Sequence, residues 1–208
     1  MSISNDYSQK LVSAEKAVSV VKNGDIVAYS HFCMFPKTLD EALAKRAGEL
    51  SNVTVKCSVG MATSQVATSD PNHESFTYVS SFFSHSERQL GDKGLAFHLP
   101  GNYGQDHWNL IRGFGHAPNV AFIKVAPMDK HGFFNLGPSA SYERATIDRC
   151  EIVVVEVNTN VPRCLGGNHE QLHVSEVDYI VESSNEPMTA LPIVPPRAED
   201  EAIANLLV

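Results

Sequence analysis

Residues 119–163, the stretch that decides the fold, read NVAFIKVAPMDKHGFFNLGPSASYERATIDRCEIVVVEVNTNVPR. Two apolar runs stand out in it, Val120–Val125 and Ile152–Val157, each short enough for a strand. Because they are almost free of polar residues, both faces of each strand should be covered, which is typical of a parallel sheet under helices. The stretch therefore predicts the buried centre of an α/β protein.

The segment between the two runs predicts one turn, one return arm and one helix. Asp129–Gly132 reads as a tight turn, in which the glycine permits a positive φ. Phe133–Gly137 then returns as a hairpin arm, and the hydroxyl of Ser141 is placed to cap a helix that extends through Arg149. The predicted order is strand, turn, hairpin arm, helix and strand.

Towards the N-terminus, the pattern predicts helices on either side of a further strand. Residues 1–10 are expected to lack regular structure, and Ser13 is expected to cap a helix Ala14–Lys22. Residues Asp25–Ser30 are predicted to form a strand. Thr38 is then expected to cap the amphipathic helix Leu39–Leu50.

The remaining elements continue this alternation. The sequence predicts strands at Val53–Val59, Phe76–Ser81 and Asp178–Glu182, and helices at Ser84–Leu95 and Gln105–Gly113. Strand and helix signals that alternate without an internal repeat favour an α/β fold with an open, mostly parallel sheet and helices on both faces. In such sheets, ligands bind at the carboxyl ends of the strands.

The C-terminal part of the chain differs in composition from the rest. Residues 1–186 predict one domain, whereas four prolines between Glu186 and Arg197 predict a semi-extended connector. Ala198–Val208 predicts a helix with acidic residues in its first turn. Since this helix lacks a C-cap glycine, residues 187–208 are interpreted as a connector and a truncated helix.

Composition and charge exclude several classes of function. The net charge of −8 and the lack of a Lys/Arg cluster argue against nucleic acid as a partner. The four cysteines are far apart, as expected for reduced thiols in the cytoplasm. The chain has no signal-like apolar core and no run long enough for a membrane span, so no membrane partner is expected.

Three further motifs suggest specific chemistry. His169, Glu170 and His173 match the H-E-x-x-H zinc pattern, but glycines precede it and a strand-like segment follows, so no metal site is expected. Cys33 near His31 suggests a thiol and a base, although buried inert cysteines are the more common case. Residues 60–64, a loop of small residues after a strand, would allow backbone amides to approach an anion.

Three motifs in order carry a resemblance to a known family. MDKHGFFNLGPS at 128–139, VEVNTNVPRCLGG at 155–167 and HVSEVDYIVE at 173–182 are similar to the N-terminal half of the acetyl-CoA hydrolase/transferase family, which includes 4-hydroxybutyrate CoA-transferases. The resemblance extends from residue 25 to residue 188. Members of that family are about twice as long as this chain.

The resemblance implies an acyl-CoA:carboxylate CoA-transferase of the acetate or 4-hydroxybutyrate type. Its substrates would be a coenzyme A thioester and a small carboxylate, and no bound cofactor is expected. The attacking glutamate would lie beyond Val208 in an absent C-terminal domain, so no catalytic residue is assigned in this chain. That missing domain would be a partner of this one, and a homo-oligomer is also expected. The alternatives are an acyl-CoA hydrolase, a non-catalytic binding domain and, last, a zinc hydrolase.

One wall of the acyl-CoA site is expected in this half. Loops that follow the first and second strands should meet at one edge of the sheet. A glycine-serine loop near the acyl site is implied by the resemblance alone. The predicted substrate-binding residues are Phe32, Met34, Gly60, Met61, Gly137 and Ser139.

Overall fold

The computed structural model describes residues 3–113 and 117–207, and its centre is a seven-stranded sheet. All neighbouring strands in the sheet pair in parallel. The strand order is β4-β3-β2-β1-β5-β7-β9. Their bounds are β1 Ile26–Tyr29, β2 Val53–Cys57, β3 Phe76–Ser80, β4 Phe97–His98, β5 Val120–Val125, β7 Ile152–Val157 and β9 Tyr179–Glu182.

The order of the strands divides the sheet at its middle. From β1 the chain adds β2, β3 and β4 on one side, and it then returns to add β5, β7 and β9 on the other. The strand order therefore reverses between β1 and β5. In open parallel sheets, the crevice at the carboxyl ends of the strands beside such a reversal is where ligands bind.

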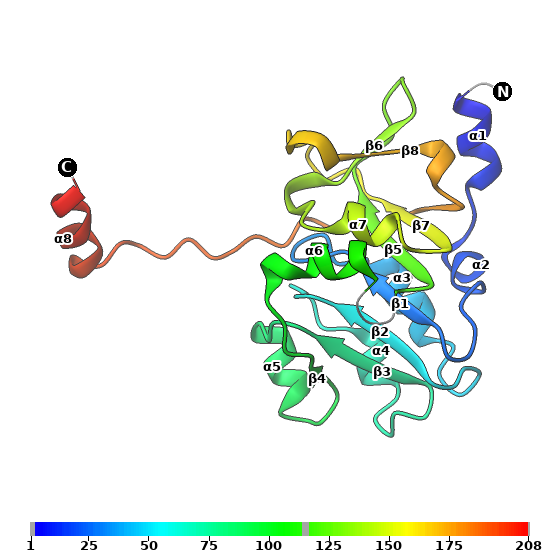
Figure 1. The fold of residues 1–208 in the computed structure, drawn as a ribbon, viewed down its shortest axis with the longest axis horizontal. Coiled ribbons are helices and arrows are strands. Elements are labelled where there is room, and N and C mark those ends of the chain that lie inside the picture. The colour runs from blue at the N-terminus through cyan, green and yellow to red at the C-terminus, as the bar shows by residue number, and fades with distance from the viewer. Residues whose placement is uncertain (1–2, 114–116, 208) are drawn as a thin grey trace.

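Helices cover both faces of the sheet, as the sequence predicts (Figure 1). One core cluster joins β1, β2 and β3 to α2, α3, α4 and α5, and the other joins β5 and β7 to α7 and a two-stranded ribbon. The helices are α1 Ile3–Lys10, α2 Ala14–Val18, α3 Lys37–Ala44, α4 Gln65–Ser69, α5 His85–Gly91, α6 Tyr103–Arg112, α7 Glu143–Ile147 and α8 Ala198–Leu207. Within the described residues, no helix has the length and apolar character needed to cross a membrane.

The two apolar runs form the centre of the molecule. Every residue of β5 is buried, and β7 is buried after its first residue. Neighbouring side chains of β5 alternate between the clusters, since Ala121 belongs to one and Phe122 to the other. The prediction that both faces of these strands are covered is confirmed.

The return arm pairs with a different partner from the one expected. β6 Phe133–Asn135 forms an antiparallel ribbon with β8 Gln171–His173. Only isolated backbone bonds tie this arm to the end of β5, such as the amide of Ala126 donating to the carbonyl of Asn135. The tight turn at its start is present, with Gly132 at φ 89°.

Residues 3–10 are ordered, contrary to the prediction for residues 1–10, of which the first two lie outside the described residues. Residues 3–10 form α1, in which the Tyr7 ring packs 6.2 Å from the ring of Phe134. The Lys10 ammonium donates to the carbonyls of Val174 and Val177. These partners are distant in sequence, and tertiary contacts rather than local signals hold a helix this short.

Two of the three predicted helix caps are wrong. Ser13 caps α2 by accepting from the Lys16 amide, but α2 ends at Val18. Thr38 lies inside α3, which begins at Lys37 and ends at Ala44. Ser141 precedes α7 with φ 44°, and its hydroxyl bonds to other side chains.

The two edge strands of the sheet differ in length and in what pairs with them. At one edge, Leu11 forms a parallel bridge with Ile180 of β9, and the Val12 amide donates to the Ile180 carbonyl at 2.9 Å. At the other edge, β4 is two residues long. Residues 183–197 then leave the sheet without regular structure and lead to α8, which has no buried residue and lies away from the body of the protein (Figure 1).

Candidate functional site

The loops after β1 and β2 meet beside the point where the strand order reverses. The Phe32 amide donates to the Val59 carbonyl at 2.7 Å, and the Met61 amide donates to the Phe32 carbonyl at 3.2 Å. These bonds place Phe32 and Gly60 side by side in an isolated parallel bridge. The carboxyl ends of the two strands therefore form one continuous surface.

Three of the predicted wall residues line a common concavity on this surface. Phe32, Met61 and Ser139 lie around it, and we call it the Phe32 concavity. Sequence reasoning missed the other residues that line it: Cys33, Tyr103, Pro138, Ala140, Ser141, Thr189 and Leu191. Tyr103 and Leu191 come from segments that carry no motif, so only the fold reveals them.

Met34 and Gly137 lie behind this wall. The Met34 side chain is 1% exposed and packs in a small cluster with Val161. Gly137 is buried with φ 65°, and a Cβ built on it would lie 2.9 Å from Met34 Cε. Met34 therefore lies beneath the loop 137–139, which begins at the buried Gly137.

Gly60 is also buried, and both of its backbone groups are already bonded. Its amide donates to Glu87 Oε1 at 2.6 Å, and its carbonyl accepts from Ser84 Oγ at 2.9 Å. The expectation that this amide is open to an anion is therefore wrong, because the carboxylate of α5 occupies that position. The Glu87 side chain also belongs to the capping box at the start of α5.

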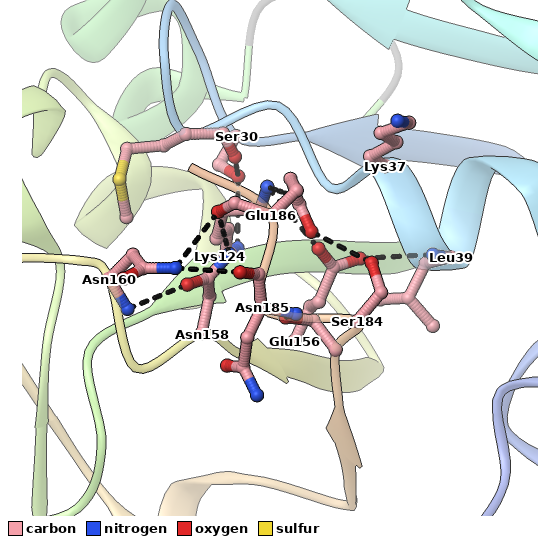
Figure 2. Close-up of polar contacts among 12 residues, drawn as sticks. Ser30, Lys37, Leu39, Lys124, Glu156, Asn158, Asn160, Ser184, Asn185 and Glu186 are labelled. Carbon is pink, nitrogen blue, oxygen red and sulfur yellow. Dashed lines mark hydrogen bonds and ion pairs between the residues drawn. The ribbon is translucent and has the colours of Figure 1, made fainter. Parts of the chain in front are cut away.

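A buried ion cluster lies beneath the same edge of the sheet (Figure 2). The Lys124 ammonium, on a side chain 4% exposed, pairs with Glu186 and lies 3.4 Å from Glu156 Oε1. Glu156 Oε2 accepts from the Leu39 amide at 3.0 Å. Burial raises the pKa of Glu156 to about 7. The pKa of Glu186 is lowered overall: its burial opposes this, but the hydrogen bond and charge of Lys124 prevail.

Asparagine side chains hold the backbone around Glu186 in place. Asn158 Nδ2 donates to the Glu186 carbonyl at 3.1 Å, and Asn160 Nδ2 donates to the Asn185 carbonyl at 2.6 Å. The Asn185 side chain in turn accepts from the Thr159 amide at 2.8 Å. The end of β9 is thus fixed to the loop that follows β7 (Figure 2).

A chain of polar side chains extends from the interior to the concavity. The Glu143 carboxylate, 2% exposed, accepts from the His31 amide at 3.0 Å. Ring atom Nδ1 of His31 lies 3.2 Å from Ser141 Oγ, which bonds to the Tyr103 hydroxyl. Burial lowers the pKa of His31 to about 3, so its ring is neutral at pH 7, and burial also raises the pKa of Glu143 well above its usual value.

The zinc pattern does not have the geometry of a zinc site. His169 ends a short 3₁₀ turn, Gly167–His169, whereas His173 ends strand β8. The pattern requires two histidines one turn apart on a helix. In the described part of the chain, no group of three or more potential metal ligands lies together.

The thiol and base proposed from Cys33 and His31 are not paired. The His31 ring contacts Ser141, Tyr142 and Glu143. Burial raises the pKa of the Cys33 thiol, which lowers its thiolate fraction at neutral pH. The structure therefore gives no support to a cysteine nucleophile at this position.

The parallel sheet that reverses its order at β1, with a concavity at that point, defines an α/β domain of the doubly wound class. The chain belongs to the acetyl-CoA hydrolase/transferase family, because the pattern of that family's N-terminal domain matches residues 1–195.

Its curated relatives include proteins named as CoA-transferases. It is 39% identical to the butyryl-CoA:acetate CoA-transferase of Anaerostipes caccae over 100% of this chain and 47% of that protein. It is 31% identical to the 4-hydroxybutyrate coenzyme A transferase of Clostridium kluyveri over 93% of this chain and 44% of that protein. The chain thus spans about half the length of the curated relatives that it matches.

A solved structure shares the whole fold. RipA from Yersinia pestis superposes with a TM-score of 0.86 at 28% sequence identity, covering 100% of this chain and 49% of that protein. The prediction of an open parallel α/β sheet and the resemblance to this family are both confirmed.

Proposed function

We propose that this chain is the N-terminal domain of an acyl-CoA:carboxylate CoA-transferase and forms one wall of its acyl-CoA site. The observation that carries the proposal is the 39% identity, along the whole chain, to a butyryl-CoA:acetate CoA-transferase. The Phe32 concavity supports it, because it lies where parallel sheets bind ligands. A short acyl thioester and acetate are the proposed substrates.

In this reaction, a glutamate carboxylate attacks the acyl thioester and expels coenzyme A as a thiolate. The mixed anhydride that forms is opened by the thiolate, giving a glutamyl-CoA thioester and releasing the first carboxylate. The second carboxylate then reacts by the reverse steps, so one difficult exchange becomes several easier ones. We propose that the attacking glutamate belongs to the half of the enzyme that follows residue 208, with residues 187–208 as the connector.

A carboxylate attacks well only in a site that excludes water and stabilises the oxyanion. A concavity with Phe32 and Met61 on one side would exclude water when a second domain closes over it. This is the role that we propose for the present domain. Burial raises the pKa of Glu143 and lowers that of His31, so it disfavours charge on both side chains behind the wall.

The test measures transfer of coenzyme A between butyryl-CoA and labelled acetate. The natural full-length chain should catalyse the exchange, whereas the 208-residue chain alone should not. Thiol release without an acceptor would instead assign a hydrolase. Exchange by the 208-residue chain, lost when one of its own glutamates is changed to glutamine, would overturn the proposed division of roles.

A further inference from the structure

The segment Asn185–Leu191, which we call the strap, passes from the ion cluster to the Phe32 concavity. It begins at Glu186, whose carboxylate pairs with buried Lys124. Met188 packs against the small cluster that contains Met34. Thr189 and Leu191 then line the concavity together with Phe32.

The chain makes little contact with the rest of the domain from Leu191 onward. The Leu191 side chain is 77% exposed although it borders the concavity, and Ile193 is 97% exposed. A leucine so exposed beside Phe32 and Met61 offers apolar surface that an aliphatic chain would bury at about 25 cal/mol per Å². The residues that line the concavity contribute apolar, hydroxyl and thiol groups.

We propose that the strap is part of the acyl-binding wall, in which Leu191 limits the length of an uncharged aliphatic acyl group on the thioester. This inference rests on the proposed function and deepens it. Glu186 and Lys124 act as positioning residues, since they hold the strap and do not contact the substrate.

The anchor matters because it fixes the start of a short segment. Pro187 fixes φ directly after Glu186, and Pro192 keeps the preceding Leu191 out of the α region. The Lys124 ammonium is almost fully buried, and it pairs with the Glu186 carboxylate, whose side chain is 20% exposed. Loss of the Glu186 charge therefore releases the start of the strap.

The first experiment uses the full-length enzyme with acetyl-, butyryl- and hexanoyl-CoA as donors and acetate as acceptor. Leu191→Ala should raise kcat/KM for hexanoyl-CoA relative to butyryl-CoA by at least about tenfold, the lower end of the effect of one methylene in an apolar pocket. Ile193→Ala, two residues further along, should leave this ratio unchanged. An unchanged ratio in Leu191→Ala, or an equal change in Ile193→Ala, would overturn the role of Leu191.

The anchor is tested by kinetics and by rescue. Glu186→Gln should raise KM for every donor with a smaller effect on kcat, because it disorders part of the binding wall. Glu186→Asp should restore part of the loss, since it keeps the charge. Glu182→Gln, on an exposed side chain four residues earlier, is the matched control. A fall in kcat alone would overturn a positioning role.

A second readout does not depend on activity. Cys33 lines the same concavity as the strap, so its alkylation by N-ethylmaleimide, followed by peptide mass spectrometry, reports whether the strap is in place. In the 208-residue chain, Glu186→Gln should speed this alkylation several-fold, and Glu182→Gln should not. Equal rates would overturn the anchor. If the wild-type enzyme transfers coenzyme A from none of the donors, the proposed function is refuted. The alkylation rates of Cys33 would still show whether Glu186 anchors the strap.

Discussion

The Leu39 amide, in the first turn of α3, donates to the Glu156 carboxylate of β7 at 3.0 Å. The two residues are 117 positions apart in sequence. An acidic side chain is favourable at a helix N-terminus, where backbone amides lack partners. Glu156, a residue of strand β7, thus acts as a capping side chain for the N-terminus of α3. The same carboxylate also contacts Lys124.

Glu156→Ala should destabilise the protein by about 3–5 kcal/mol, because it leaves the Lys124 charge and the Leu39 amide with fewer partners in a buried site. Urea unfolding at neutral pH, followed by circular dichroism, measures the change. Glu151→Ala, at an exposed position just before β7, should change the free energy of unfolding by less than about 0.5 kcal/mol. Similar values for the two variants would contradict the buried role of Glu156.

The pKa of Glu156 also predicts a pH dependence. Burial raises it from 4.5 to about 7, so between these values the folded protein holds a proton that the unfolded chain has released. Its stabilising contribution is complete below about pH 4.5 and is lost as the pH rises through about 7. In Glu156→Gln, the fall in unfolding free energy over this window should be smaller, by an amount on the order of 3 kcal/mol. Identical slopes in the two proteins would refute the shift.

Gly60→Ala should lower stability by about 1–3 kcal/mol, the usual cost of overpacking. The added Cβ would lie 2.9 Å from Glu87 Oε1 and 3.1 Å from the Phe35 ring. At Gly101, the nearest atom to an added Cβ is 3.5 Å away, so Gly101→Ala is the control. The larger Gly60→Val would therefore disturb the fold itself. Equal thermal midpoints for the two alanine variants would contradict this packing argument.

A comparison of two glycines that both have positive φ distinguishes the cost of backbone strain from the cost of overpacking. Gly137→Ala and Gly24→Ala both place a side chain in the left-handed region, at φ 65° and 82°. A Cβ at Gly137 would lie 2.8 Å from Val161 Cγ1, whereas one at Gly24 has no atom within 4 Å. Both variants should lose about 1 kcal/mol to strain, and Gly137→Ala about 1–3 kcal/mol more to overpacking. Denaturant melts that show equal losses would rule out the packing contribution.

Removal of residues 189–208 should leave the stability of the domain unchanged within about 0.5 kcal/mol, because surface changes remote from buried contacts have small effects. Residues 190–207 are exposed, and α8 has no buried residue. Chains that end at 188 and at 208 can be compared by urea unfolding. A marked loss in the shorter chain would show that the connector contributes to the core and would contradict the proposed domain boundary.

Most strands of the large sheet could be predicted from the sequence because their signal is local, whereas β4 and β8 were missed. Val120–Val125 and Ile152–Val157 needed only short apolar runs, and the structure places β5 and β7 at these positions. The helix starts were harder. Thr38 has the correct residue type for a cap, but the acceptor for Leu39 is Glu156, which no rule on neighbouring residues can find.

The site could be predicted only in outline. Phe32 and Met61 follow strands whose parallel pairing brings them together, so periodicity and topology were sufficient. Gly60 follows a strand in the same way, but its amide is bonded to Glu87, 27 residues away. Lys124 lies within a predicted apolar strand, and no local pattern in the sequence identifies the two carboxylates that pair with it, Glu156 and Glu186.

The bridge between Leu11 and Ile180 has a consequence for the behaviour of the domain in solution. A free edge strand is a template on which other chains add strands and polymerise. The Val12 amide already bonds to the edge strand β9, and the opposite edge, β4, offers only two residues. Both edges of the sheet therefore offer little free backbone on which a strand of another chain could pair.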